Sequence, residues 1–258
     1  MSSYVQLLDN LERLKLTKMK EYLPHYLDEN IAKEMSFTEA LKELTEKELA
    51  FREERAAAIG MKKSRFPYQK GIRDFDFGYQ PSISKAQILD FSTLRFLETS
   101  DNILFIGSSG VGKTHLATAI GIEASNRRVS TYFIHFTDLV SKLKRAYAEN
   151  RQERVIKHFA RYGLLIIDEI GYLPIEKEYS NLFFQLIASR YERRSTIITT
   201  NQPLSRWGEV FGDPTIATAI IDRLVHHSSI VKITGRSYRI KDKIAIEETE
   251  SSSERGRI

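Results

Sequence analysis

Apolar residues recur at three- and four-residue spacing along the first 59 residues of the chain, a stretch that contains no glycine. This spacing predicts amphipathic helices, and we expect Pro24 to break or begin one of them. Ser36 and Glu39 stand at the spacing of a capping box, which predicts the start of a last long helix. We expect that helix to end at Gly60. The pattern therefore predicts a small N-terminal helical domain over residues 1–60.

Beyond residue 85 the pattern changes to short β-branched runs that alternate with helical stretches. Such alternation predicts an α/β fold, a doubly wound parallel sheet with helical crossovers. We expect this domain over residues 85–246, with the glycine- and proline-containing stretch 61–84 as a connector. The Ser/Glu-rich end, 247–258, lacks periodic apolar residues and predicts a disordered tail. The five predicted strands are 103–106, 130–136, 163–167, 195–200 and 229–234.

Composition excludes several classes of protein. The chain has 258 residues and no cysteine, which excludes disulfides, thiolate metal sites and a cysteine nucleophile. No apolar stretch approaches the roughly 20 residues that span a bilayer, and the N-terminus lacks a secretory apolar region. We therefore expect a soluble cytoplasmic protein with no membrane partner. None of the six histidines has a carboxylate at metal-triad spacing, and we expect these histidines, like the single residue Trp207, to serve packing or the surface.

The net charge of +5 is modest, so the distribution of charge matters more than its size. Residues 1–60 carry nine Lys or Arg against twelve Asp or Glu, a balance of −3. Positive charge gathers instead in 61–80, 142–161 and 232–243. Clusters of this kind are typical of proteins that bind polyphosphates, including nucleic acids, and equally of a solvated basic face.

A glycine-rich segment between a predicted strand and a predicted helix carries the clearest chemistry. It has the G-x4-G-K-[ST] form of a phosphate loop, whose glycines let backbone N–H groups converge on phosphate oxygens at a helix N-terminus. Lys113 is expected to reach the β- and γ-phosphates of ATP, and Thr114 to ligate magnesium. The predicted nucleotide-binding residues are Gly107, Ser108, Ser109, Gly110, Val111, Gly112, Lys113, Thr114 and His115.

Polar residues follow two later strands. Asp168 and Glu169 end the run that begins at Leu164, and Asn201 ends the next strand. We expect Asp168 to hold magnesium and Glu169 to polarise an attacking water. If the strand of Asn201 lies between those of the phosphate loop and of Asp168, Asn201 would help to position that water. Alone, each of these features has a plain structural alternative, such as a helix start or a turn.

This set resembles the AAA+ ATPases, and the extra basic helix predicted at 138–162 resembles the initiator clade, which includes DnaC-type helicase loaders. The likeness to the IstB family, the ATPase helpers of insertion-sequence transposition, extends from the connector to about residue 243. The segments that carry it are Asp74-Phe75-Asp76-Phe77, GSSGVGKTHLA, LLIIDEIGYLP, TIITTNQP and Gly235-Arg236-Ser237-Tyr238-Arg239.

The resemblance implies an ATPase that assembles into rings or helical filaments on duplex DNA and recruits or stimulates a partner transposase. It also implies that an arginine from the neighbouring subunit completes each ATP site. Arg223 is the best match, and a surface salt bridge with Asp222 is the plain alternative for it. Too few residues follow the fifth strand for the usual C-terminal helical lid. We therefore do not expect Arg236 or Arg239 to act as a sensor of the nucleotide in its own subunit, and either residue could instead contact DNA or cap a terminal hairpin.

The basic helices near 142–161 are the expected DNA contact, because lysines and arginines on a helix surface neutralise backbone phosphates without reading sequence. Three other functions remain open: a helicase loader that prefers single-stranded DNA, an ATP-gated scaffold with negligible turnover, and a small-molecule kinase. The kinase is disfavoured by the water-activating pair and by the lack of an evident lid. The predicted DNA contacts are Lys142, Lys144, Arg145, Arg151, Arg154 and Lys157.

Overall fold

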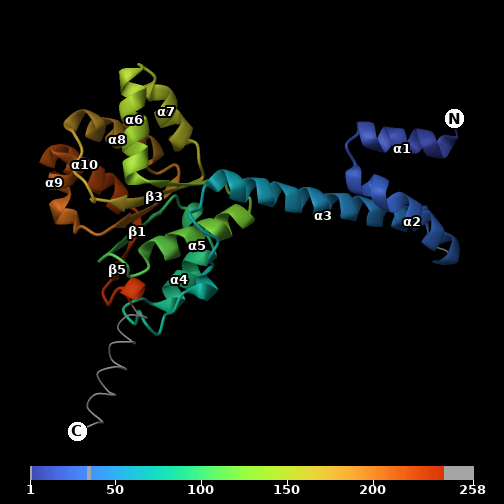
Figure 1. Cartoon of the computed structure of the whole chain (residues 1–258), viewed down its shortest axis with the longest axis horizontal. Helices are drawn as coiled ribbons and strands as arrows, with labels where there is room; N and C mark the ends of the chain where they lie inside the picture. Colours follow the sequence, from blue (N-terminus) through green and yellow to red (C-terminus); the bar gives the residue numbers. More distant parts are fainter. Residues whose placement is uncertain (1, 34–35, 241–258) are drawn as a thin grey trace, which may run out of the picture. The chain divides into compact units, whose positions relative to one another are not determined.

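The computed structural model describes residues 2–33 and 36–240. Its contacts divide the chain into two compact units, residues 1–59 and 60–258 (Figure 1). The predicted tail 247–258 lies outside the described residues. None of the described helices is both long enough and apolar enough to cross a membrane.

The first unit consists of helices α1 (Ser3–Arg13), α2 (Thr17–Lys33) and most of α3 (Phe37–Ser64). A small apolar cluster of Leu11, Met19, Leu23 and Leu44 holds it together. The buried carboxylate of Glu48 accepts hydrogen bonds from the backbone N–H groups of Lys18 (2.7 Å) and Met19 (3.4 Å), and therefore caps the positive end of α2.

Two expectations for these helices are wrong and one is confirmed. Helix α2 continues through Pro24, and α3 continues past Gly60 to Ser64. This last turn belongs to the second unit, where Ser64 Oγ donates to the Gly60 carbonyl oxygen at 2.9 Å and lies 3.4 Å from Ser125 Oγ. The capping box is present, since the Glu39 N–H donates to Ser36 Oγ (3.3 Å) and the Ser36 N–H to Glu39 Oε2 (3.0 Å).

A five-stranded sheet in the order β2-β3-β4-β1-β5 forms the centre of the second unit, and all its strand pairs are parallel. This confirms the predicted α/β fold. Strand β4, which Asn201 follows, lies between β1 and β3, and this is the order in which Asn201 is expected to help position the attacking water. The strands are β1 (Asn102–Gly107), β2 (Thr131–His135), β3 (Leu164–Ile170), β4 (Ser195–Thr200) and β5 (Ser228–Ile233).

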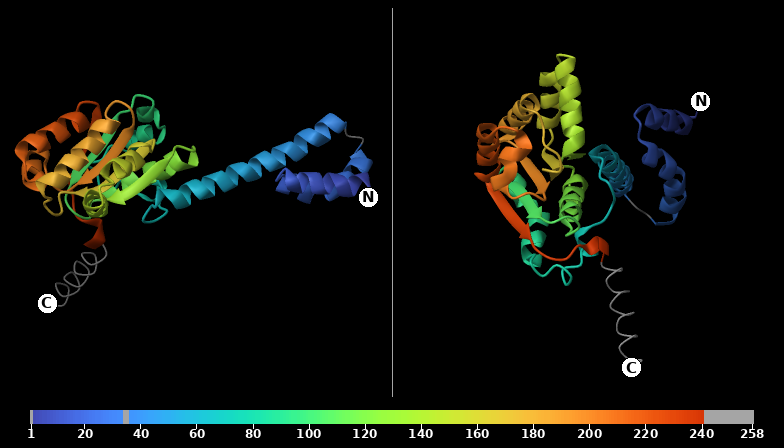
Figure 2. Two further views of the ribbon diagram at one scale, coloured as in Figure 1. Left: turned by 90° about the horizontal axis from the view of Figure 1, so that it is seen from above. Right: turned by 60° about the vertical axis from the view of Figure 1, so that its left-hand side comes forward.

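Helices cover both faces of the sheet, as Figures 1 and 2 show. Successive residues of a strand point to opposite faces: Ile103 and Phe105 pack against α4 and α5, whereas Leu104 packs in the cluster of the other face. The first face carries α4 (Lys85–Ser92) and α5 (Lys113–Asn126). The second carries α6 (Phe136–Ala148), α7 (Gln152–Ala160), α8 (Lys177–Arg190), α9 (Trp207–Phe211) and α10 (Pro214–Val225).

Short 3-10 helices complete the second unit: η1 (Ile72–Asp74), η2 (Arg95–Leu97), η3 (Leu204–Arg206) and η4 (Tyr238–Ile240). After β5, the described residues, which end at residue 240, contain only η4. Trp207 is fully buried in the core between α9 and the sheet, which confirms its packing role.

Candidate nucleotide-binding site

The glycine-rich loop connects the end of β1 to the start of α5, as the sequence predicts. Gly110 and Gly112 adopt φ angles of +80° and +98°, which residues with a side chain rarely tolerate. A Cβ on Gly110 would also overlap Ser237, and one on Gly112 would overlap the ring of Phe75. Both glycines are therefore required by backbone conformation and by packing.

Lys113 is buried at the base of this loop. Its Nζ donates hydrogen bonds to the carbonyl oxygens of Gly107 (2.8 Å) and Ser108 (2.6 Å). Burial lowers the pKa of Lys113, while the carboxylates of Asp168 and Glu169 oppose that shift. A polyphosphate in the loop would favour the charged lysine further, so the residue fits the role of a phosphate ligand.

Thr114 and Asp168 meet although they are 54 positions apart. Thr114 Oγ1 donates to Asp168 Oδ1 at 2.9 Å, and Asp168 is fully buried. Burial raises the pKa of Asp168, whereas hydrogen bonds from Thr199 (2.6 Å) and Thr114 lower it. A hydroxyl beside a carboxylate is a donor set of the kind Mg²⁺ takes in phosphate-binding proteins, so these residues fit the metal.

Glu169 leaves the line of β3. Its φ is +63°, and the pairing of β3 with β4 shifts register between Ile167 and Ile170. The Glu169 N–H donates to Thr199 Oγ1 at 2.9 Å, which holds this strained conformation. The exposed side chain consequently faces the nucleotide cavity, while the neighbouring Asp168 stays in the interior.

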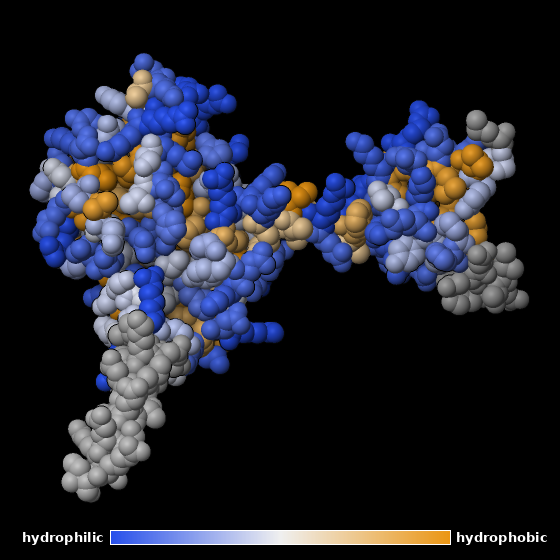
Figure 3. Space-filling view, viewed as in Figure 1, coloured by the Kyte–Doolittle hydropathy of each residue, from blue (hydrophilic) through white to orange (hydrophobic). Residues whose placement is uncertain are grey.

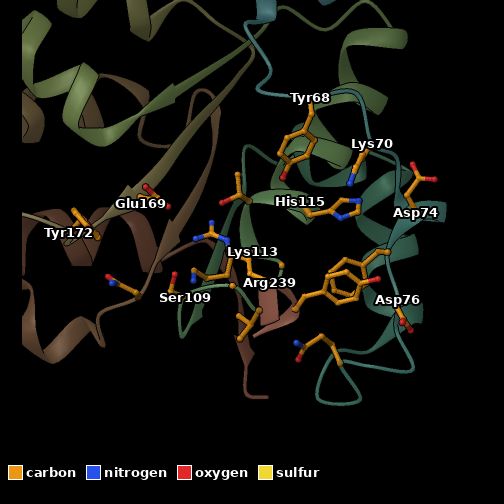
Figure 4. Close-up of a pocket in the computed structure, with 18 residues that line it drawn as sticks. Tyr68, Lys70, Asp74, Asp76, Ser109, Lys113, His115, Glu169, Tyr172 and Arg239 are labelled. Carbon is orange, nitrogen blue, oxygen red and sulfur yellow. The ribbon is translucent and has the colours of Figure 1, made fainter. Parts of the chain in front are cut away.

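A cavity of about 570 Å³ gathers most of the predicted site residues, a size typical of small-molecule sites. In Figure 4, Glu169 and Tyr172 lie on one side of it, Tyr68, Lys70 and His115 lie on the other, and Lys113 lies between them. Gly107, Ser108 and Asp168 do not line the cavity but contact residues that do. The predicted residues that line it are Ser109, Gly110, Val111, Gly112, Lys113, Thr114, His115, Glu169 and Asn201.

Sequence reasoning missed the second wall of this cavity, which comes from the stretch predicted as a connector. His115 Nε2 lies 2.9 Å from the Gly71 carbonyl oxygen, and the His115 ring packs edge-on against Phe75 at 5.4 Å. Only the Asp74–Phe77 segment, which contributed to the family resemblance, carried a signal for this wall. The lining residues from the stretch are Tyr68, Lys70, Asp74, Phe75, Asp76 and Gln80.

Arg239 also lines the cavity, although we did not expect it to face the nucleotide of its own subunit. The backbone gives the reason: the Tyr238 N–H donates to the Gly110 carbonyl oxygen at 2.9 Å, which holds this segment on the phosphate loop. A second missed residue is His135. Its Nδ1 lies 3.3 Å from Asp168 Oδ2 because strand register pairs the two residues, so His135, Asp168 and Glu169 form a cluster of possible metal ligands.

Arg223 lies on α10 and does not line the cavity. Its guanidinium lies 4.6 Å from the centre of the Phe184 ring and donates to the Ala219 carbonyl oxygen at 3.1 Å. A surface salt bridge with Asp222 would be the plain alternative to a role at a subunit interface. In the described part of the chain, Arg223 and Asp222 do not form this ion pair.

Most of the basic side chains predicted to contact DNA form ion pairs with carboxylates of the same chain. Lys144 pairs with Glu176 (2.8 Å) and Lys157 with Glu153 (2.6 Å). Arg145 and Arg151 both pair with Glu149. Among residues 2–33 and 36–240, only Lys142 and Arg154 of the predicted set lack such a partner. Figure 3 shows the region of α6 and α7 covered largely by hydrophilic residues.

A parallel sheet in this order, with a phosphate loop after β1 and an acidic pair at the end of β3, defines a P-loop nucleotide-binding protein of the AAA+ class. The fold resembles two solved structures of that class. One is DnaI, with a TM-score of 0.55 and 20% identity over 64% of this chain and 92% of that one. The other is AMPPCP-bound DnaA from Aquifex aeolicus, with a TM-score of 0.56 and 15% identity over 71% and 56%.

Sequence comparison identifies the family. The model of the IstB-like ATP binding proteins matches residues 9–245, and the chain belongs to this family. A relative from Bacillus thuringiensis subsp. berliner, named for ATP binding and for insertion sequence IS232, is 55% identical over 95% of this chain and 98% of its own length. A relative from Pseudomonas aeruginosa, named likewise for IS21, is 40% identical over 90% and 88%.

Proposed function

We propose that this protein is a cytoplasmic ATPase that binds duplex DNA, oligomerises on it, and recruits or stimulates a partner transposase. The names of its relatives connect ATP binding with insertion sequences, and the cavity residues support nucleotide hydrolysis. Clustered positive charge in the second unit supports a polyanionic partner.

Each cavity residue has a distinct role in the proposed hydrolysis. Lys113 and the loop N–H groups bind the β- and γ-phosphate oxygens. Glu169 accepts a proton from the water whose oxygen forms a bond to the γ-phosphorus as the bond to the β-phosphate oxygen breaks, and Asn201 orients that water. Thr114 and Asp168 would hold a magnesium ion, which neutralises charge on the phosphates.

The observation that carries this proposal is the conformation of Glu169. A strained backbone and a shift in strand register bring its carboxylate to the cavity that also contains Lys113 and Asn201. Strain of this kind persists where the surrounding structure enforces it, and it concentrates at functional sites. A carboxylate at this position can accept the proton of an attacking water.

Glu169→Gln tests the proposal. We expect ATP turnover to fall by about 100-fold or more because the general base is lost, while ATP binding and ATP-dependent assembly on duplex DNA persist. Phosphate release, nucleotide titration and DNA co-sedimentation measure these properties. Glu192→Gln is the matched control: Glu192 also has a positive φ of 55° and an exposed carboxylate, but does not line the cavity.

Other outcomes would favour the other functions. Wild-type protein that binds ATP and DNA but releases no phosphate would favour an ATP-gated scaffold. Preferential binding of single-stranded DNA together with a hexameric helicase would favour a helicase loader. Binding of a transposase only by the ATP-bound assembly on duplex DNA would support the proposed function.

A further inference from the structure

Two adjoining cavities lie along β2, which is an edge strand of the sheet. The larger, of about 640 Å³, is lined by Lys62, Lys63, Arg65, Tyr132, Arg161 and Tyr162 among others. The smaller, of about 190 Å³, shares Arg65 and Tyr132 with it and adds Lys142 and Asp138. We call the two together the β2-edge pocket. It draws its residues from the end of α3, from β2, from α6 and from the turn after α7.

Charge in the β2-edge pocket is almost entirely positive. Within residues 2–33 and 36–240, none of its five lysines and arginines has a carboxylate within ion-pair distance, and Asp138 is the one acidic residue in its lining. This contrasts with Lys144, Arg145, Arg151 and Lys157 on α6 and α7, which all have carboxylate partners. Burial, followed by the charges of Arg161, Lys142 and Arg65, lowers the pKa of the neighbouring His158.

Aromatic rings lie beside two of these five cations. The Arg65 guanidinium lies 5.8 Å from the centre of the Tyr132 ring, and that of Arg161 lies 5.6 Å from the centre of the Tyr162 ring. The two tyrosine rings are 4.9 Å apart, and His158 packs edge-on against both. Stacking of this kind fixes arginine geometry without neutralising its charge. The pocket is therefore a cluster of like charges, with its two arginines placed by aromatic rings, and an anionic ligand would stabilise it.

We propose that the β2-edge pocket binds the sugar-phosphate backbone of duplex DNA. The inference rests on the proposed function and names the surface that carries out its DNA-binding step. Unpaired lysines and arginines spread over two cavities suit successive phosphates better than a single small anion. Bound DNA would also lie close to the nucleotide site, because His135 lines the smaller cavity and contacts Asp168.

The test compares two double variants of the full chain. Arg65→Gln with Arg161→Gln removes charge from the pocket, and Arg145→Gln with Lys157→Gln removes the same charge from α6 and α7. A labelled duplex and a non-hydrolysable ATP analogue are used, and anisotropy is measured across a salt series. We expect the pocket variant to bind about tenfold more weakly at about 0.1 M salt, with a salt slope lower by about one to two, and the control to change much less.

Two further measurements separate the possible failures. Arg65→Lys with Arg161→Lys retains charge and should restore much of the affinity, and basal ATP turnover without DNA should be unchanged in every variant. Wild-type protein that does not bind duplex DNA would refute the proposed function itself. DNA binding that is normal in the pocket variant, or is lost equally in the control, would overturn the pocket assignment alone. Loss of transposase binding with normal DNA binding would overturn it in favour of an acidic protein partner.

Discussion

At the residue scale, Thr199 connects the two acidic residues of the site. Its Oγ1 donates to Asp168 Oδ1 at 2.6 Å and accepts the N–H of Glu169 at 2.9 Å. One hydroxyl therefore orients the expected metal ligand and stabilises the strained backbone that presents the expected base. Loss of a hydrogen bond that orients a metal ligand typically costs about 10- to 100-fold in metal affinity or activity.

Thr199→Val should consequently lower ATP turnover by about 10- to 100-fold, because Asp168 loses a hydrogen-bond donor and the Glu169 N–H loses its acceptor. The side-chain volume is nearly unchanged. Steady-state phosphate release as a function of magnesium concentration measures the effect, which should include a higher magnesium requirement. Thr199→Ser keeps the hydroxyl and should retain most of the activity; equal activity of the valine variant would show that the hydroxyl is dispensable.

At the element scale, Arg190 connects helices to the sheet on the face opposite α5. It is almost fully buried at the end of α8, and its guanidinium donates to the carbonyl oxygens of Phe159, Ala160 and Tyr162 at 2.8–3.1 Å. It also donates to Thr196 Oγ1 at 3.0 Å and to the Ser195 carbonyl oxygen. Carbonyl groups at the negative end of α7 thus receive a cation and hydrogen bonds together.

Arg190→Met should lower the free energy of unfolding of the second unit by about 3 kcal/mol or more, since several buried carbonyl groups lose their donor. Denaturant titration followed by fluorescence of the single, buried Trp207 reports on this unit. Arg193→Met, at an exposed position three residues later, should change the value by less than about 0.5 kcal/mol. Equal denaturant midpoints for the Arg190→Met and Arg193→Met variants would contradict the stabilising role assigned to Arg190.

At the scale of the whole molecule, one predicted catalytic residue, Arg223, does not lie in the nucleotide cavity. Arg223 lies away from the cavity of its own chain, where it packs on Phe184. If it completes the cavity of a neighbouring copy, hydrolysis and assembly are coupled. A guanidinium that enters only when subunits pack would make turnover depend on protein concentration.

Mixing two inactive variants tests this coupling. Arg223→Ala and Glu169→Gln should each reduce turnover by about 100-fold or more while sparing nucleotide binding. A mixture should regain activity, because some interfaces then combine an intact Glu169 with an intact Arg223 from the next subunit. No recovery in a mixture that forms joint oligomers, or full Arg223→Ala activity in dilute monomer, would exclude a role in trans.

Local signals in the sequence were sufficient for the five parallel strands, for the phosphate loop and for the acidic pair. The reason is that each depends on neighbouring residues: buried strands require apolar runs, and the positive φ angles of Gly110 and Gly112 require glycine. The order of the strands then brings Thr114, Asp168 and Asn201 to one edge, because parallel strands end on the same side of a sheet.

Tertiary structure alone decided the features that join distant segments. The sequence of 61–84 resembles a loop, but its packing makes it a wall of the cavity. Likewise, the pairing of α6 and α7 cations with carboxylates depends on which side chains the fold brings together, and so does the lack of such partners for the β2-edge pocket among the described residues. Contacts at long sequence separation leave no periodic trace along the chain, since their energy depends on the packed arrangement as a whole.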